Sequence, residues 1–406
     1  MQQVKWLRNG AVLLFGVVAA FIMLEIFFRV VPTGFMDYRS NIRYIPDDAA
    51  GIKLKPNQSV SSMSTCYKIS PVTTNSIGFR DKEWSKNFYD IAVLGDSYVE
   101  AAQIPEEHSA GELIEKILDV DVLNSGVSGY GTIHEFFCYR KYVARYKPRV
   151  LLLFFSGNDV EDNSCETSRM KGVLCATVSE HGEILVSPLN NRLIEIKEYM
   201  RHACRSCYGL LKLWVTIKST LGRGKEKRPR LESAPVEDSP SKGWRITEYF
   251  FRRLNEELNA NKGTLVLVPI PGHGAAAMMQ LSQICQRNKI RLLLIDEGFA
   301  KYQMTFNLPK PYFGYRCDGH WNPLAHFLAA NIVSKYLLSE NLIEVRNKDR
   351  MLASIERNLC QSPVRVLGEE VYAQIYEGGF YEGKSNILRI LGKTNRGVPI
   401  PQIHIR

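Results

Sequence analysis

Several patterns that would assign a function directly are missing from this sequence. No stretch interleaves aromatic residues with arginines, so the formal net charge of +10 does not indicate a nucleic-acid partner. No segment repeats along the chain, which argues against a solenoid or a propeller. The C-x-x-C pair Cys204 and Cys207, preceded by His202, has no second ligand pair at zinc spacing. The sequence therefore implies no metal, no organic cofactor and no nucleic acid.

The nine cysteines fit local disulfides better than metal binding or redox catalysis. An oxidising compartment permits disulfides, and Cys165 with Cys175 could close a small loop. We interpret Cys204 and Cys207 as structural cysteines or a local bridge. Because the number of cysteines is odd, at least one thiol stays unpaired within the chain.

The bulk composition is that of an ordinary folded protein, with 45% hydrophobic and 23% charged residues. A length of 406 residues suits one large α/β domain with insertions, or two smaller domains. The excess of basic residues, with local runs such as residues 222–230, fits an anionic membrane surface or an acidic polymer as partner. The sequence gives no indication of an oligomeric state.

Residues 10–31, GAVLLFGVVAAFIMLEIFFRVV, form one long apolar run. Its length suffices to span a bilayer, which takes roughly 20 apolar residues. Lys5 and Arg8 precede the run and predict that residues 1–9 stay in the cytoplasm. A cleaved signal peptide would have a shorter apolar core before a small-x-small site, and a buried soluble helix rarely follows a basic flank at the N-terminus. We predict an uncleaved single-pass anchor, with the rest of the chain outside the cytoplasm.

Strands and helices alternate over residues 89–340. Residues 32–88 contain four prolines that break any long helix, and we expect an irregular lead-in there. The predicted strands are residues 90–96, 120–126, 149–159, 264–271 and 290–296, and the predicted helices are residues 108–118, 132–146, 244–260, 275–288 and 323–338. Apolar strands with helices between them are typical of a parallel sheet covered on both faces. We predict a three-layer α/β/α sandwich with a central parallel five-stranded sheet.

The alternation lapses at residues 160–243, which we interpret as an insertion that shapes substrate choice. It contains a predicted helix near residues 190–219 and the charged, proline-bearing stretch 222–242, which we expect to be a mobile loop. Residues 341–406 carry mixed charge and several glycines. We leave them as a C-terminal extension without an assigned role.

Chemically useful residues follow three of the predicted strands. After the first strand, the motif GDS, which ends at Ser97, leads into a helix. The second strand leads into a glycine-rich turn that contains Gly129, and the third ends in SGND, which contains Asn158. The segment RCDGHWNPLAH, before the last helix, carries Asp318 and His320. Because the carboxyl ends of parallel strands lie at one edge of a sheet, these side chains are expected to converge.

This set is what acyl transfer needs. His320 can take the proton of the Ser97 hydroxyl, and Asp318 can fix the imidazole and stabilise its charged form. The Ser97 amide, the Gly129 amide and the Asn158 side-chain amide can bind the oxyanion. Each residue alone also has an ordinary structural explanation, as a helix cap, a turn glycine or a structural histidine. Their order and their shared position at strand ends favour catalysis.

The four blocks resemble the SGNH hydrolase family, the GDSL-type esterases, over roughly residues 73–340. Together with the anchor they most resemble membrane-anchored bacterial members of that family. The resemblance implies a serine acyl hydrolase with Ser97 as nucleophile, Gly129 and Asn158 as oxyanion donors, and Asp318 with His320 as acid and base. We expect Asp96 to be a structural hydrogen-bonding residue at the pocket and His273 to line the pocket. Asn75 and Arg80 are expected to hold the entry loop against the site.

The spacing D-x-H, in place of the D-x-x-H of many members, resembles the branch that includes alginate O-acetyltransferase-like proteins. The predicted function is therefore hydrolysis of a carboxylic ester, an O-acyl or O-acetyl group on a cell-envelope substrate. The first alternative is an O-acyltransferase that uses the same residues on envelope polysaccharide. The second is a non-catalytic envelope-assembly or glycan-binding protein.

Overall fold

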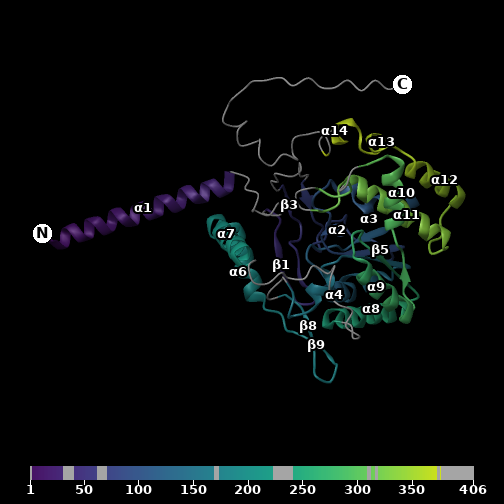
Figure 1. The fold of residues 1–406 in the computed structure, drawn as a ribbon, viewed down its shortest axis with the longest axis horizontal. Helices are drawn as coiled ribbons and strands as arrows, with labels where there is room; N and C mark the ends of the chain where they lie inside the picture. Colours follow the sequence, from purple (N-terminus) through teal and green to yellow (C-terminus); the bar gives the residue numbers. More distant parts are fainter. Residues whose placement is uncertain are drawn as a thin grey trace.

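The computed structural model describes residues 2–30, 41–61, 71–168, 173–222, 241–308, 312–315, 319–372 and 375. Its centre is a five-stranded sheet of order β11-β10-β7-β5-β6, in which every neighbouring pair is parallel (Figure 1). The strands are β5 (Ile91–Gly95), β6 (Val122–Asn124), β7 (Val150–Phe155), β10 (Thr264–Pro269) and β11 (Arg291–Leu292). Numbered along the chain, the order is 2-1-3-4-5, as in flavodoxin-like sheets. The predicted fold class is confirmed.

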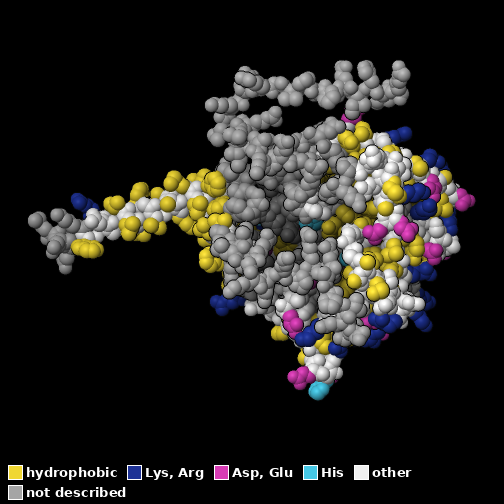
Figure 2. Space-filling model, in the orientation of Figure 1, with side chains coloured by type: hydrophobic (Ala, Val, Ile, Leu, Met, Phe, Trp, Pro, Cys, Tyr) yellow, Lys and Arg dark blue, Asp and Glu magenta, His cyan; other side chains and the backbone are white. Residues whose placement is uncertain are grey.

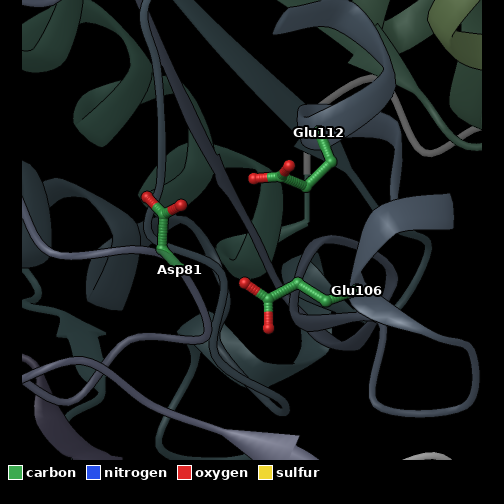
Figure 3. A group of neighbouring side chains, drawn as sticks. All are labelled: Asp81, Glu106 and Glu112. Atoms are coloured by element: carbon green, nitrogen blue, oxygen red, sulfur yellow. The ribbon is translucent and has the colours of Figure 1, made fainter. Parts of the chain in front are cut away.

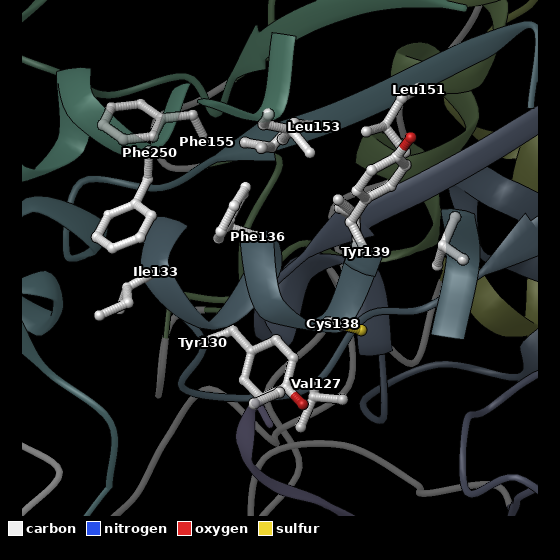
Figure 4. Packing of buried hydrophobic residues seen from close by; sticks show 14 of the residues in the cluster. Val127, Tyr130, Ile133, Phe136, Cys138, Tyr139, Leu151, Leu153, Phe155 and Phe250 are labelled. Atoms are coloured by element: carbon white, nitrogen blue, oxygen red, sulfur yellow. The ribbon is translucent and has the colours of Figure 1, made fainter. Parts of the chain in front are cut away.

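The central strand β7 is buried on both faces, because its sequence VLLLFF carries no polar residue. Successive side chains of a strand point to opposite faces of the sheet. One set belongs to the hydrophobic core on one face: Leu151, Leu153 and Phe155. The alternate set belongs to the core on the other face: Val150, Leu152 and Phe154. Figure 4 shows Phe136 and Phe250 packed over the first of these faces.

Helices cover both faces of the sheet. The helices α4 (Thr132–Cys138), α8 (Lys242–Ala260) and α9 (Ala275–Arg287) contribute to the first core. The helices α3 (Ala110–Leu118), α10 (Asp296–Thr305) and α11 (Pro323–Ser339) contribute to the second. A side-chain cap begins α3, where Ser109 accepts a hydrogen bond from the amide of Glu112.

Some predicted elements differ in extent from the observed ones. The α-helix expected at residues 132–146 ends at Cys138 and continues as a π turn and a 3₁₀ turn to Tyr146. The edge strand β11 is shorter than the expected strand at residues 290–296, and α10 begins at Asp296, where no helix was predicted. The helix expected near residues 190–219 is two helices, α6 (Asn191–Ala203) and α7 (Arg205–Gly222).

The lead-in is more regular than expected. It forms the antiparallel pair β1 (Tyr44–Asp47) with β2 (Gly51–Leu54), and the pair β3 (Ser59–Val60) with β4 (Val72–Thr73). The insertion holds α5 (Asp159–Asn163), the hairpin β8 (Ala176–Val178) with β9 (Ile184–Val186), and the helices α6 and α7. The expected mobile loop lies largely outside the described residues.

Two disulfides are present, each between cysteines whose spacing allowed a local bridge. Cys165 pairs with Cys175, and Cys204 pairs with Cys207 at the junction of α6 and α7. The thiols of Cys138 and Cys285 are free and buried, and that of Cys360 is free and exposed.

Both ends of the chain carry helices outside the sandwich. The helix α1 (Gln2–Val30) is long and apolar enough to cross a membrane over Arg8–Arg29, with a mean hydropathy of 2.6. Hydrophobic atoms cover its exposed surface (Figure 2). After α11, the helices α12 (Lys348–Leu359), α13 (Pro363–Leu367) and α14 (Glu369–Tyr372) follow, and α12 packs against α11. The first part of the predicted C-terminal extension therefore packs on the sandwich, and residues 376–406 lie outside the described part.

Candidate active site

Ser97 lies at the carboxyl edge of the sheet, on a sharp turn between β5 and the short helix α2 (Ser97–Glu100). Asp96 caps this helix by accepting a hydrogen bond from the amide of Tyr98. The turn requires glycine at position 95, since a Cβ there would lie 2.4 Å from Cγ2 of Val99. The expected strand–GDS–helix arrangement is present.

His320 reaches Ser97 across the site. Its Nε2 lies 2.8 Å from Oγ of Ser97, although 223 residues separate the two in the chain. Two backbone hydrogen bonds join Tyr315 to the other arm of the turn, one from the Tyr315 amide to the His320 carbonyl and one from the Gly319 amide to the Tyr315 carbonyl, each at 2.8 Å. The ring of Tyr98 packs on that of His320, with centroids 5.3 Å apart. This geometry lets the imidazole take the hydroxyl proton.

Asp318, the expected acid, lies outside the described residues. The role of Asp318 therefore stays a prediction from the sequence. The turn that carries His320 continues directly into α11, whose first amides are capped by the side chain of Asn322. Asn322 also donates a 2.8 Å hydrogen bond to the carbonyl of Tyr312. These contacts tie the turn to the start of a long buried helix.

The glycine-rich loop after β6 runs alongside the nucleophile turn. The amides of Ser125 and Val127 donate to the carbonyls of Val93 and Gly95, which extends the pairing with β5 beyond the end of β6. Gly129 follows with a φ of 88°, a left-handed conformation that favours glycine. This loop is thus held at the same sheet edge as Ser97, as expected.

Asn158 also lies at this edge and contacts the nucleophile turn. Ser156 Oγ donates a 2.6 Å hydrogen bond to Asn158 Oδ1, and Asn158 Nδ2 donates a 3.2 Å hydrogen bond to Asp162. Both side chains also lie close enough to the Asp96 carboxyl group to interact with it. Burial raises the pKa of Asp96, while these interactions and the nearby His320 act in the opposite direction. Asp96 therefore lies between the end of β5 and the end of β7.

Two more buried carboxyl groups lie behind this edge. Glu135 on α4 and Asp159 at the start of α5 are fully buried, and burial raises the pKa of each well above its usual value. Repulsion from each other and from Asp96 adds to this effect on Asp159. Burial therefore favours the neutral form of both carboxyl groups.

His273, the residue expected to line the pocket, lies beside the SGND block. Its ring stacks on Phe155, the last residue of β7, with centroids 5.5 Å apart and an interplanar angle of 10°. A Cβ on Gly157 would lie 3.5 Å from Cε1 of His273. Burial lowers the pKa of His273, which favours the neutral ring. His273 thus lies next to Gly157, the residue before Asn158, at the same sheet edge.

Arg80 and Asn75 hold the lead-in against the site. The buried guanidinium of Arg80 donates to the carbonyls of Glu100, Ala101 and Ile104, in the segment that leaves α2. Asn75 Oδ1 accepts hydrogen bonds from the amides of three residues that precede Arg80, namely Ile77, Gly78 and Phe79. Arg80 thereby fixes the far end of the nucleophile helix.

An acidic group next to Arg80 does not extend the site. The carboxylates of Asp81, Glu106 and Glu112 lie within 4.8 Å of one another (Figure 3). Asp81 accepts hydrogen bonds from the Trp84 indole and the Asn124 amide, and burial raises its pKa to about 8. Arg80 supplies a positive charge beside the group. Contacts within the chain account for these acids, and we assign no ligand to them.

One contributor to the site's geometry was missed from the sequence. Glu100, the last residue of α2, is fully buried and accepts hydrogen bonds from the Ser128 amide and the Tyr44 hydroxyl. It joins the nucleophile helix, the glycine-rich loop and the lead-in. A glutamate in the first turn after GDS was the available signal, but its partners lie far away in sequence.

The comparisons with known proteins match the fold only loosely. No protein-family model matches the sequence, and no curated protein matches it. Among solved structures, the chain is similar to TesA, at 13% identity and a TM-score of 0.35 over 62% of this chain and 99% of the other. It is also similar to a putative lipolytic protein of the G-D-S-L family from Desulfitobacterium hafniense, at 13% identity and a TM-score of 0.34 over 60% and 97%. A catalytic mutant of Axe2, an acetylxylan esterase from Geobacillus stearothermophilus, gives 12% identity and a TM-score of 0.35 over 64% and 97%.

At these TM-scores the similarity carries no argument about activity. The fold is assigned instead from the strand order, the parallel pairing and the helices on both faces. The chain is therefore a doubly wound α/β sandwich that gathers Ser97, the Gly129 loop, Asn158 and His320 at one sheet edge.

Proposed function

We propose that this chain is a serine acyl hydrolase of the SGNH type. The observation that carries the proposal is the 2.8 Å contact between Oγ of Ser97 and Nε2 of His320 at the carboxyl edge of a parallel sheet. A serine hydroxyl is a weak nucleophile until a base removes its proton, and a neutral imidazole at this distance is such a base. The nearby glycine-rich loop and Asn158 support the proposal, because they place amide groups beside the same edge.

In the proposed mechanism, Ser97 Oγ attacks the carbonyl carbon of a carboxylic ester as His320 takes its proton. The amides of Ser97 and Gly129 and the side-chain amide of Asn158 stabilise the oxyanion. His320 then protonates the departing alcohol, and an acyl-enzyme remains. Water, activated by His320, releases the acid. In this scheme Asp318 orients the imidazole and stabilises its charged form.

The proposed location follows from α1. Its apolar stretch would anchor the chain, with residues 1–9 in the cytoplasm and the catalytic domain of residues 89–340 on the outer side. The two disulfides support an oxidising compartment for that domain. An O-acyl group on a cell-envelope substrate would then be within reach, and the insertion at residues 160–243 would shape the choice among such substrates.

The test is labelling of the full-length protein with a fluorophosphonate probe, which reacts with activated serines. We expect Ser97 to be labelled, and expect labelling to be lost in Ser97→Ala and strongly reduced in His320→Ala. The exposed Ser85 offers a matched control, because Ser85→Ala should label like the wild type. Absence of labelling in a wild-type protein that retains its circular dichroism spectrum would overturn the proposal. Labelling that persists in Ser97→Ala would place the nucleophile elsewhere.

A further inference from the structure

The helix α7 presents an apolar face to its surroundings. Leu210, Leu211, Leu213 and Trp214 are all exposed, and Trp214 exposes 64% of its surface. These positions share one broad side of a helix, since residues three and four apart are neighbours on its surface. Tyr208 and Gly209 are buried on another side of the helix, and Ser206 is buried in its first turn, where α7 meets α1. A surface helix in contact with water would carry polar side chains where α7 carries leucines and a tryptophan.

The buried side of α7 packs against the outer end of α1. Glu25 accepts hydrogen bonds from the amides of Arg205 and Ser206 and from the Ser206 hydroxyl, at 3.1, 2.8 and 2.6 Å. The ring of Phe28 lies on Gly209, where a Cβ would come within 2.8 Å of the ring. The absence of a side chain at position 209 leaves room for the Phe28 ring in its present position. Glu25 is the one acidic residue of the apolar stretch, and these contacts explain its presence there.

The position of this contact sets the level of α7 relative to a membrane. Glu25 precedes Arg29, the end of the apolar stretch, by four residues, which is about 6 Å along a helix. The beginning of α7 therefore lies at the level where the apolar surface of α1 ends. In Figure 1, α7 lies next to the end of α1 that adjoins the rest of the fold. The exposed apolar face of α7 thus continues the apolar surface of α1 at the boundary between lipid and water.

We propose that α7 is an interfacial helix, which lies in the outer surface of the bilayer with Leu210, Leu211, Leu213 and Trp214 among the acyl chains. Tryptophan and leucine on one side are typical of such helices, which bury that side at the headgroup boundary. The inference rests on the proposed anchor. In this proposal, α7 holds the catalytic domain at a fixed distance from the membrane, so that the domain binds its substrate at the bilayer surface.

The experiment uses the full-length protein in vesicles of phosphatidylethanolamine and phosphatidylglycerol, with tryptophan fluorescence as the readout. Lipids brominated either near the headgroup or near the end of the acyl chain quench nearby tryptophans. The Trp214 signal is the difference between wild type and Trp214→Phe, and the Trp6 signal is obtained in the same way from Trp6→Phe. Trp6, on α1, reports insertion of the anchor independently of α7.

We expect flotation with the vesicles, quenching of Trp6, and quenching of Trp214 that is stronger for bromine near the headgroup. In Leu210→Ser/Leu211→Ser the quenching of Trp214 should fall at least twofold. The matched control Met279→Ser/Met304→Ser, which changes exposed apolar residues on α9 and α10, should leave it unchanged.

Three outcomes would contradict the inference. Flotation and Trp6 quenching without Trp214 quenching, while aqueous iodide does quench Trp214, would show that α7 faces water. If neither brominated lipid nor iodide quenched Trp214, and if this protection depended on the protein density in the vesicles, the apolar face of α7 would be assigned to contact with a second copy of the chain. Failure of flotation with no Trp6 quenching would overturn the anchor itself, and this inference with it.

Discussion

The carboxylate of Glu100 accepts a 2.6 Å hydrogen bond from the amide of Ser128, the residue immediately before Gly129. A second bond, of 2.9 Å, comes from the hydroxyl of Tyr44 on β1. A buried carboxylate that accepts from both partners fixes the distance between the nucleophile helix and the glycine-rich loop. Glu100 thus controls the geometry of the proposed oxyanion site without touching substrate.

Replacing Glu100 by glutamine tests this control. Glu100→Gln replaces the carboxylate with an amide oxygen, which is a weaker acceptor for the Ser128 amide, and the Gly129 loop is expected to shift. We expect kcat for p-nitrophenyl acetate to fall roughly 10- to 100-fold with KM little changed, since small displacements of catalytic groups are costly. Tyr44→Phe removes only the second bond and should cost less. Unchanged kcat in Glu100→Gln would show that the loop is held by other contacts.

Gly126 is expected to be irreplaceable by alanine. A Cβ at this position would lie 2.4 Å from the Glu100 amide nitrogen and 2.6 Å from the Val99 carbonyl carbon, both backbone atoms. Gly126→Ala should therefore displace α2, lower kcat at least about 10-fold, and reduce the free energy of unfolding by about 1–3 kcal/mol.

Gly111 provides the control for this substitution, because it lies in α3 and a Cβ there would meet Asn124 only at an ordinary 3.7 Å. Gly111→Ala should leave kcat unchanged and raise the free energy of unfolding by roughly 0.5–1 kcal/mol. Urea unfolding and steady-state kinetics measure both variants. Equal changes of kcat and of the free energy of unfolding in Gly126→Ala and Gly111→Ala would refute the steric argument.

Replacing Arg80 is expected to lower the free energy of unfolding by more than the loss of one charge would. Arg80→Met would deprive three buried carbonyl groups of their donor, at about 1–3 kcal/mol each before relaxation. We expect a loss of roughly 3–5 kcal/mol in urea unfolding, and a partial recovery with Arg80→Lys, which keeps the charge but lacks the planar fork. Arg252→Met removes an exposed pairing with Glu256 and should change stability by less than about 1 kcal/mol.

Acid should destabilise the protein in part through His326. This side chain on α11 is fully buried, its Nδ1 accepts a hydrogen bond from the Ala110 amide, and burial lowers its pKa to about 3. In the unfolded chain the imidazole takes up a proton below about pH 6.5, whereas in the folded protein it stays neutral until about pH 3. Its contribution to stability is therefore complete above pH 6.5 and is lost as the pH falls toward 3.

At pH 4.5 this loss amounts to about 2–3 kcal/mol, since each unit of pKa difference is worth about 1.4 kcal/mol. His326→Gln, which cannot titrate, should flatten the fall in the free energy of unfolding between pH 7 and pH 4.5 by that amount. His181→Gln changes an exposed histidine and should leave the fall as it is in the wild type. An equal slope in His326→Gln and wild type would contradict the assignment.

The sheet and the residues at its edge could be predicted from the sequence for a physical reason. Strands buried on both faces are continuous apolar runs, and in a parallel sheet the residues just after them lie at one edge. The location of Ser97, Gly129 and Asn158 at that edge could therefore be predicted from the strands that precede them. Contacts that depend on three-dimensional packing could not be found in this way. The partners of Arg80 lie 20 to 24 residues away, and those of Glu100 lie 28 and 56 residues away, with no periodic signal to reveal them.

The sequence also could not show which apolar side chains stay exposed. Hydropathy gives the same pattern for a helix that faces a protein core and for one that faces lipid, so α7 looked like an ordinary helix of the insertion. The break between α6 and α7 at Cys204 was hidden for the same reason, because helical periodicity continues on both sides of it.

The pairing of Ser97 with His320 has a consequence for biosynthesis. Ser97 follows the first strand of the sheet to be synthesised, and His320 precedes α11, the last helix of the sandwich. A chain that is still being synthesised therefore carries Ser97 long before it carries His320. Under the proposed function, hydrolytic competence therefore arises only once synthesis has passed His320, and a chain truncated before that residue is inert.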